Sequence, residues 1–121
     1  EKGMDAVMQG VIERWFTPGF RARAPQEVER IAAQTRSTPP EGYAKACEAI
    51  RDLDLRDQTR AITTRTLVIA GTHDPATPPA DGKFIHDNIK GSRYLELDAA
   101  HISNVEAAPA FTKALVDFLA A

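Results

Sequence analysis

Asp74 and His101 are the two residues whose types and placement could carry out proton transfer. Each lies in a loop after a predicted β-strand, and these strands are the apolar run 66–70 and the alternating run 93–97. Neighbouring parallel strands lie about 4.8 Å apart, so loops at their carboxyl ends can touch. A carboxylate beside an imidazole orients the ring, which can then take a proton from a nucleophile. The spacing therefore predicts the acid and the base of a nucleophilic relay.

Other interpretations of these loops stay open. Asp74 precedes Pro75, and an Asp-Pro pair is also common in turns, where the carboxylate only caps the backbone. A metal site formed by His73, Asp74 and His101 is geometrically possible, although no ligand spacing such as H-E-x-x-H accompanies it. We therefore expect neither a metal nor a cofactor. His86 is expected on the solvent side of its helix.

The sequence offers no nucleophile in a suitable setting. Its serines are Ser37, Ser92 and Ser103, and none lies in the G-x-S-x-G motif of a strand–turn–helix nucleophile. An H-G-G segment, which could donate hydrogen bonds to an oxyanion, is also missing from the sequence. We therefore expect the attacking group and the oxyanion donors to come from outside these 121 residues.

The periodicity of apolar residues predicts the elements that position Asp74 and His101. Helices are predicted over 4–16, 25–35, 41–53, 80–89 and from 109 towards the C-terminus. Residues 20–24 are expected to form a loop. Cys47 lies in the apolar stripe of its helix and is expected to be buried. Phe84, Ile85 and Ile89 are expected to face inward, and the strand 66–70 should be buried on both faces.

The order strand, helix, strand over 66–97 makes a βαβ unit, in which the two strands are parallel. The fold class is therefore α/β. Residues 1–53 contain three short helices joined by proline-marked turns, and they show no strand pattern. We divide the chain into a helical region, 1–53, and an α/β region, 54–121.

Composition narrows the possible functions. A chain of 121 residues with 43% hydrophobic and 26% charged residues is typical of one small globular domain. The net charge of −2 gives no electrostatic reason to expect binding to nucleic acid or to an acidic membrane surface. No apolar run approaches the length of a membrane span. The single cysteine excludes an internal disulfide.

Two motifs resemble the C-terminal part of the α/β-hydrolase family: G-T-H-D-P-A-T-P-P at 71–79 and D-A-A-H-I-S-N-V-E at 98–106. In that family the chain order is nucleophile, acid, histidine. The resemblance implies that Asp74 is the acid and His101 the histidine. It also implies a partial α/β-hydrolase fold, in which 1–53 is a helical cap and 54–121 holds the last two strands of the core.

Within this family the segments R-W-F-T-P-G-F-R-A-R at 14–23 and D-L-R-D at 54–57 resemble the 3-oxoadipate enol-lactonases, which act in the β-ketoadipate route of bacterial aromatic catabolism. The resemblance implies hydrolysis of a small anionic lactone or ester by a cytoplasmic enzyme without a cofactor. Trp15 is then expected to line the pocket. Arg14, Arg21 and Arg23 are candidates for binding the carboxylate of the substrate, because a cap arginine suits that charge.

The resemblance leaves the strand at 66–70 without one of its usual neighbours. We expect its open apolar edge to seek a partner, either the missing N-terminal half of the enzyme or another copy of the chain. The isolated chain is predicted to be inactive. Two alternatives stay open: a non-catalytic binding or assembly module that reuses this half-fold, and a metal-dependent hydrolase.

Overall fold

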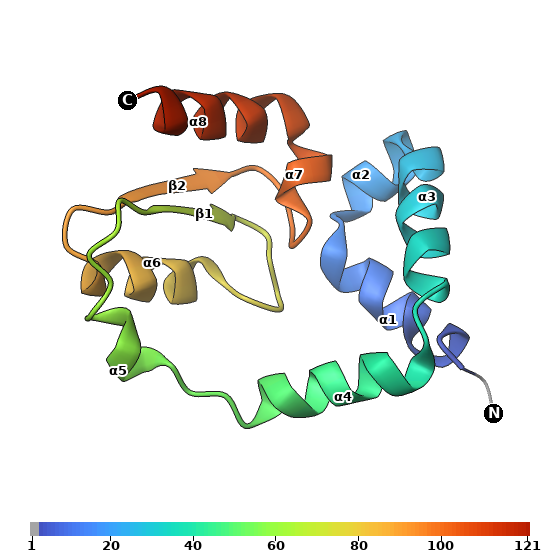
Figure 1. Cartoon of the computed structure of the whole chain (residues 1–121). Coiled ribbons are helices and arrows are strands. Elements are labelled where there is room, and N and C mark those ends of the chain that lie inside the picture. Colours follow the sequence, from blue (N-terminus) through green and yellow to red (C-terminus); the bar gives the residue numbers. More distant parts are fainter. Residues whose placement is uncertain (1–2) are drawn as a thin grey trace.

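The computed structural model describes residues 3–121 (Figure 1), so the first two residues of the predicted region 1–53 lie outside it. Its helices are α1 (Asp5–Trp15), α2 (Pro18–Arg23), α3 (Pro25–Arg36), α4 (Pro40–Arg51), α5 (Arg56–Thr59), α6 (Pro79–Asn88), α7 (Ser103–Glu106) and α8 (Ala108–Ala120). Its strands are β1 (Leu67–Gly71) and β2 (Arg93–Leu97). The prediction of a loop over 20–24 is wrong, because α2 extends to Arg23. This helix begins at Pro18 after the N-cap Thr17, whose side chain accepts a hydrogen bond from the Phe20 amide.

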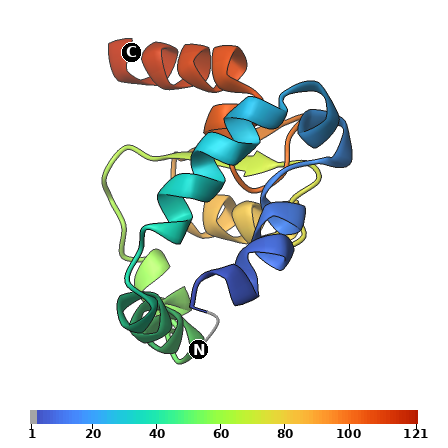
Figure 2. The ribbon, with the colours of Figure 1, turned by 90° about the vertical axis from the view of Figure 1, so that its right-hand side faces the viewer.

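β1 and β2 form a parallel pair whose register runs from Leu67 opposite Arg93 to Gly71 opposite Leu97. α6 connects the two strands and packs on both. The predicted βαβ unit and its α/β class are therefore confirmed. Both views place the strands between α6 and α8 (Figures 1 and 2). Helices α1–α3 lie beyond the carboxyl ends of the strands and stand in front of them in Figure 2.

Gly71 allows the loop after β2 to pass close to the end of β1. A Cβ at this position would overlap the carbonyl oxygen of Ala100 and would lie 2.6 Å from that of Ala99. Both alanines are buried. The glycine that ends the apolar run is thus required by the close approach of the two loops.

β1 differs from the prediction of a strand buried on both faces. Ala70 and Gly71 are buried, whereas Leu67, Val68 and Ile69 are only half-buried. In residues 3–121 the sheet consists of β1 and β2 alone, so β1 is paired along one edge. The burial that its composition suggests needs a neighbour that these residues do not supply.

α6 packs on the sheet through a different face from the predicted one. A Cβ on Gly82 would lie 3.3 Å from both Ala70 Cβ and Tyr94 Cε2, so this small residue sets the close contact. Ile89 is buried as predicted, but Phe84 and Ile85 are exposed. The prediction that Phe84 and Ile85 face inward is wrong, because the close contact of α6 with the strands requires a small residue on the facing side of the helix.

His86 shares the inward side of α6, contrary to the prediction of a solvated histidine. Its Nδ1 lies 2.7 Å from Ser92 Oγ, and its ring stacks on Tyr94 with 5.7 Å between the centroids. The ring is half-buried. His86 is therefore part of the packing between α6 and β2.

The N-terminal helices have a small apolar core of their own, formed by Met4, Met8, Val11, Phe16, Phe20 and Ala32. α4 stands apart from it and has no buried residue (Figure 1). Cys47, predicted to be buried, is exposed, and Ile50 is 69% exposed. In the stripe predicted on 41–53, Tyr43 is half-buried, whereas Ala46, Cys47, Ile50 and Leu53 are exposed in the described residues. Within the same residues, no helix combines the length and the apolar character that crossing a membrane requires.

Candidate functional site

The structure brings Asp74 and His101 together at the carboxyl ends of β1 and β2. Asp74 Oδ2 lies 2.8 Å from His101 Nδ1. The pairing of the strands continues into the loops, because the Thr72 amide donates to the Leu97 carbonyl at 2.8 Å and the His73 amide donates to the Ala99 carbonyl at 3.0 Å. Backbone pairing thus sets the separation of the two loops independently of the side-chain contact.

Asp74 is held by hydrogen bonds to both of its carboxylate oxygens, and only 5% of its side chain is exposed. Oδ1 accepts from the amides of Ala76 and Thr77, at 2.8 and 3.1 Å. Oδ2 accepts from Thr77 Oγ1 at 2.7 Å in addition to facing His101. Burial opposes ionisation, but these hydrogen bonds outweigh it and hold the pKa of Asp74 below its ordinary value. Asp74 therefore both caps the turn and stays charged beside the imidazole.

His101 keeps one ring nitrogen free of the carboxylate. Nδ1 contacts Asp74 and lies 3.3 Å from Thr77 Oγ1, so Nε2 is the nitrogen available for exchanging a proton with a substrate or nucleophile. The side chain is 34% exposed. Trp15 flanks it with its ring stacked at a centroid distance of 6.4 Å. The pair is thus buried at the acid and accessible at the base.

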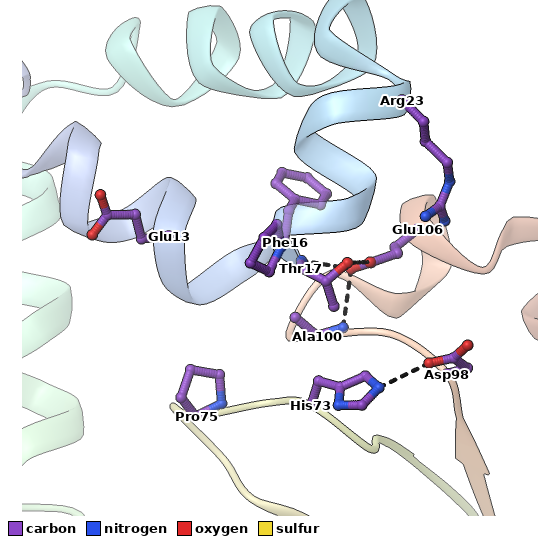
Figure 3. A pocket seen from close by; sticks show the side chains of 10 residues that line it. Glu13, Phe16, Thr17, Arg23, His73, Pro75, Asp98, Ala100 and Glu106 are labelled. Carbon is purple, nitrogen blue, oxygen red and sulfur yellow. Dashed lines mark hydrogen bonds and ion pairs between the residues drawn. The ribbon is translucent and has the colours of Figure 1, made fainter.

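Asp74 and His101 line a hollow of about 340 Å³ together with Thr77, Asp81, Ile85, Ser103 and the inner residues of β1. A second hollow, of about 380 Å³, lies on the other side of the same loops, below the α1–α2 turn (residues 15–17) (Figure 3). Its walls include Arg23, His73, Asp98 and Glu106.

The three predicted arginines lie at different places. Arg23 lines the second hollow and has its guanidinium 5.0 Å above the Phe20 ring. Arg21 is half-buried among α1 and α3, and its Nε is buried without a hydrogen-bond partner in the described residues. Arg14 is exposed on α1. None of the three lines the hollow that contains His101.

His73 points away from the pair, as expected from its position next to Asp74. Its Nε2 lies 2.9 Å from Asp98 Oδ1, and both side chains face the second hollow (Figure 3). Across residues 3–121, no cluster of three or more His, Cys, Asp or Glu side chains has an arrangement that could hold a metal ion. The geometry thus gives no support to a metal site of His73, Asp74 and His101.

Two residues at the site were not singled out from the sequence. Thr77 lies three residues after Asp74, which is the spacing at which an Asp side chain caps a turn, and this signal could have identified it. Glu106 contacts Thr17, which is 89 residues away in the sequence. No local pattern reports a contact between residues so far apart.

Three comparisons relate the chain to known proteins. Residues 41–121 match the family model Abhydrolase_4, described as TAP-like protein. The chain is 43% identical to 3-oxoadipate enol-lactonase 2 of Acinetobacter baylyi over 95% of its own length and 43% of that protein. It is 31% identical to 3-oxoadipate enol-lactonase 1 of the same organism, over 97% of its length and 44% of that protein.

The chain is also similar to parts of two solved structures. The enol-lactonase from Burkholderia xenovorans matches with a TM-score of 0.96 and 47% identity, over 98% of this chain and 45% of that one. A hydrolase from Pseudomonas aeruginosa matches with a TM-score of 0.93 and 40% identity, over 100% of this chain and 46% of that one. The chain thus spans less than half the length of these relatives.

Proposed function

Because the chain belongs to the α/β-hydrolase family, we propose that it provides the acid and the general base of a serine-type hydrolase of carboxylic esters or lactones. The observation that carries this proposal is the 2.8 Å contact between Asp74 Oδ2 and His101 Nδ1 at the ends of neighbouring parallel strands. The serine belongs to a segment outside this chain. The most specific substrate we propose is 3-oxoadipate enol-lactone, since two relatives carry the name of that activity.

The proposed reaction has two stages. In the first, Nε2 of His101 takes the proton of the serine hydroxyl while the serine oxygen bonds to the lactone carbonyl carbon. The ring carbon–oxygen bond then breaks, and His101 passes the proton to the departing enol oxygen. In the second, His101 takes a proton from water, whose oxygen bonds to the acyl carbon. The bond between the acyl carbon and the serine oxygen then breaks, and His101 gives the proton to that oxygen. Asp74 stabilises the imidazolium in both stages and holds its tautomer.

The carboxylate of such a substrate requires a cationic partner. Arg23 is the best placed of the three candidates, because it lines a hollow that borders both loops of the site. Replacing Arg23 by Ala in an active enzyme should raise KM about tenfold. The matched change Arg14→Ala, on the exposed side of α1, should leave KM unchanged. If Arg23→Ala leaves KM unchanged too, Arg23 does not bind the carboxylate.

We further propose that the unpaired edge of β1 and the exposed faces of α4 and α6 are covered by the N-terminal half of a hydrolase. β1 is only half-buried here, and the relatives are more than twice as long as the segment that matches. A second copy of this chain is the alternative partner for that edge. Light scattering separates the two: a dimer of the isolated chain would favour the second. A cytoplasmic location is part of the same proposal.

A fusion protein tests the function directly. The N-terminal part of the Burkholderia xenovorans enol-lactonase, up to the start of the matched segment, would be joined to residues 1–121. We expect hydrolysis of the enol-lactone, loss of that activity in His101→Gln, and no effect of a chelator. A folded fusion that binds the lactone but hydrolyses neither it nor simple esters would contradict the proposal and favour a non-catalytic module.

A further inference from the structure

A buried carboxylate, Glu106, joins the N-terminal helices to the loop that carries His101. Its Oε2 accepts hydrogen bonds from the amides of Ala100, at 3.0 Å, and Thr17, at 3.3 Å. Its Oε1 accepts from the Thr17 hydroxyl. Figure 3 shows these contacts converging where α7 approaches the α1–α2 turn. One side chain thus binds two segments that are far apart in the sequence.

The setting of Glu106 indicates a specific need for a carboxylate. The residue is buried, and none of the cation–carboxylate pairs of the described residues includes it. Burying a carboxylate is costly unless hydrogen bonds compensate, and here donors approach both oxygens. An apolar side chain would fill the space and leave the Ala100 and Thr17 amides unpaired. The interaction therefore does more than pack.

His101 is bound on both sides to the same turn. The amide before it, on Ala100, donates to Glu106, which holds Thr17. The amide after it, on Ile102, donates to the carbonyl of Trp15 at 3.1 Å. The Trp15 ring also stacks on the imidazole. A shift of the α1–α2 turn is therefore a shift of the backbone that carries the general base.

We propose that Glu106 is a positioning residue. It holds the His101 loop against the α1–α2 turn, so that the imidazole keeps its contact with the Asp74 carboxylate. The inference rests on the proposed function for its catalytic meaning. Its structural content is independent of that function: without the Glu106 carboxylate, the imidazole should leave its single position beside Asp74.

Nitrogen-15 NMR of the imidazoles in this 121-residue chain tests the structural part. The wild-type chain should show His101 as one tautomer with its proton on Nδ1. Glu106→Gln should weaken this preference, and Glu106→Ala should give mixed tautomers and about tenfold faster exchange of the Ala100 amide. Glu48→Gln and Glu48→Ala, the same changes on the exposed side of α4, should leave both signals unchanged. An unchanged His101 spectrum in Glu106→Ala would overturn the proposal.

Thr17 supplies a second route if Glu106→Ala does not fold. Thr17→Ser keeps the hydroxyl that contacts Glu106 and caps α2, whereas Thr17→Val removes both interactions. The proposal expects Thr17→Ser to retain the wild-type imidazole spectrum and Thr17→Val to lose it. Equal imidazole spectra for Thr17→Ser and Thr17→Val would contradict the proposal that the contact between Thr17 and Glu106 positions His101.

Kinetics of the fusion protein test the catalytic part. With rates expressed per titrated active site, Glu106→Gln should lower kcat about tenfold or more and leave KM within about twofold, because misplacing a general base affects the chemical step. A merely structural role would lower the number of active sites and leave kcat per site unchanged, and that result would overturn the inference. If the wild-type fusion does not hydrolyse the lactone, the proposed function fails, while the imidazole spectra still decide the role of Glu106.

Discussion

Two His–Asp pairs connect the same two loops at similar distances. They differ in the exposure of their side chains and in the hydrogen bonds that hold the acid. Asp74 after β1 meets His101 after β2 at 2.8 Å, whereas His73 after β1 meets Asp98 after β2 at 2.9 Å. The side chains of Asp74 and His101 are 5% and 34% exposed. Those of Asp98 and His73 are 95% and 55% exposed. The chain thus contains, side by side, one pair whose acid is buried and one pair whose two side chains are exposed.

Distance alone does not distinguish the pair that we propose to be catalytic from the exposed pair. Asp74 has amide and hydroxyl donors on both of its oxygens, so its position is fixed from several directions. Asp98 has His73 as its side-chain partner and is otherwise in water. Exposed ion pairs are screened and contribute little, because water competes for both partners. The fixed orientation that general base catalysis needs is supplied by the network around Asp74.

The largest expected effect separates the two pairs by the same change at each acid. In the fusion protein, Asp74→Asn should lower kcat by about 10³–10⁴-fold, since an amide cannot stabilise the imidazolium and can favour the wrong tautomer. Asp98→Asn should change kcat by about twofold or less, because His73 is not in the relay. Steady-state kinetics with the enol-lactone measure both. A loss in Asp98→Asn as large as that in Asp74→Asn would show that the exposed pair takes part in the reaction.

The second effect tests what the two pairs share. Both depend on the close approach of the loops at Gly71, so Gly71→Ala should destabilise the chain by about 1–3 kcal/mol as the new methyl pushes the Ala100 backbone away. Gly42→Ala is the matched control, because a Cβ at this position in α4 meets nothing within 4 Å. It should raise stability slightly, as Ala is the better helix former. Urea unfolding followed by circular dichroism measures both.

An unchanged stability in Gly71→Ala would mean that the loops can separate without cost, which contradicts the tight approach. Amide hydrogen exchange at Thr72 and His73 measures the approach of the loops independently, since these amides donate to the carbonyls of Leu97 and Ala99. Both amides should exchange faster in Gly71→Ala and be unaffected in Gly42→Ala.

The sequence was sufficient to predict that Asp74 and His101 meet. This prediction depended on two short strands with clear patterns and on the rule that a strand–helix–strand connection gives a parallel pair. Parallel pairing then places both loops at one edge of the sheet without any knowledge of side-chain packing. The pairing of the strands does not by itself decide which side chains meet, since His73 and Asp98 lie in the same two loops and contact each other.

The orientation of helices could not be predicted with equal success. Phe84 and Ile85 form the apolar stripe of α6, yet Gly82 faces the strands because close packing there requires a small residue. The stripe on α4 has the right period, but periodicity does not identify what covers it, and Cys47 is exposed as a result. Burial depends on the partner of a surface, and a single amphipathic segment does not encode that partner.

The third effect isolates one donor of the network around Asp74. Thr77→Val removes the hydroxyl that donates to Asp74 Oδ2 and lies near His101 Nδ1, and it keeps the size of the side chain. We expect kcat of the fusion to fall about tenfold with little change in KM, because the carboxylate loses part of its fixed orientation. Thr72→Val, which removes a hydroxyl bonded to the Leu97 carbonyl, is the matched control and should have a smaller effect on kcat. Equal losses in the two variants would mean that the loop as a whole, and not the Thr77 hydroxyl, sets the rate.

The smallest effect is the dependence of stability on pH, which also distinguishes the two acids. Burial raises the pKa of Asp74, but its hydrogen bonds together outweigh this effect, so the pKa is lowered in the folded chain. A depressed folded-state pKa stabilises the fold above the unfolded-state value of about 3.9, and this stabilisation is lost as the pH falls through the folded-state pKa. Urea unfolding of the isolated chain should therefore show a difference between wild type and Asp74→Asn that is constant near neutral pH and shrinks below about pH 4. Near neutral pH the corresponding difference for Asp98→Asn should be small, since that carboxylate is almost fully in water. A difference for Asp74→Asn that grows on acidification would mean that the network stabilises the protonated form of Asp74 and not the carboxylate.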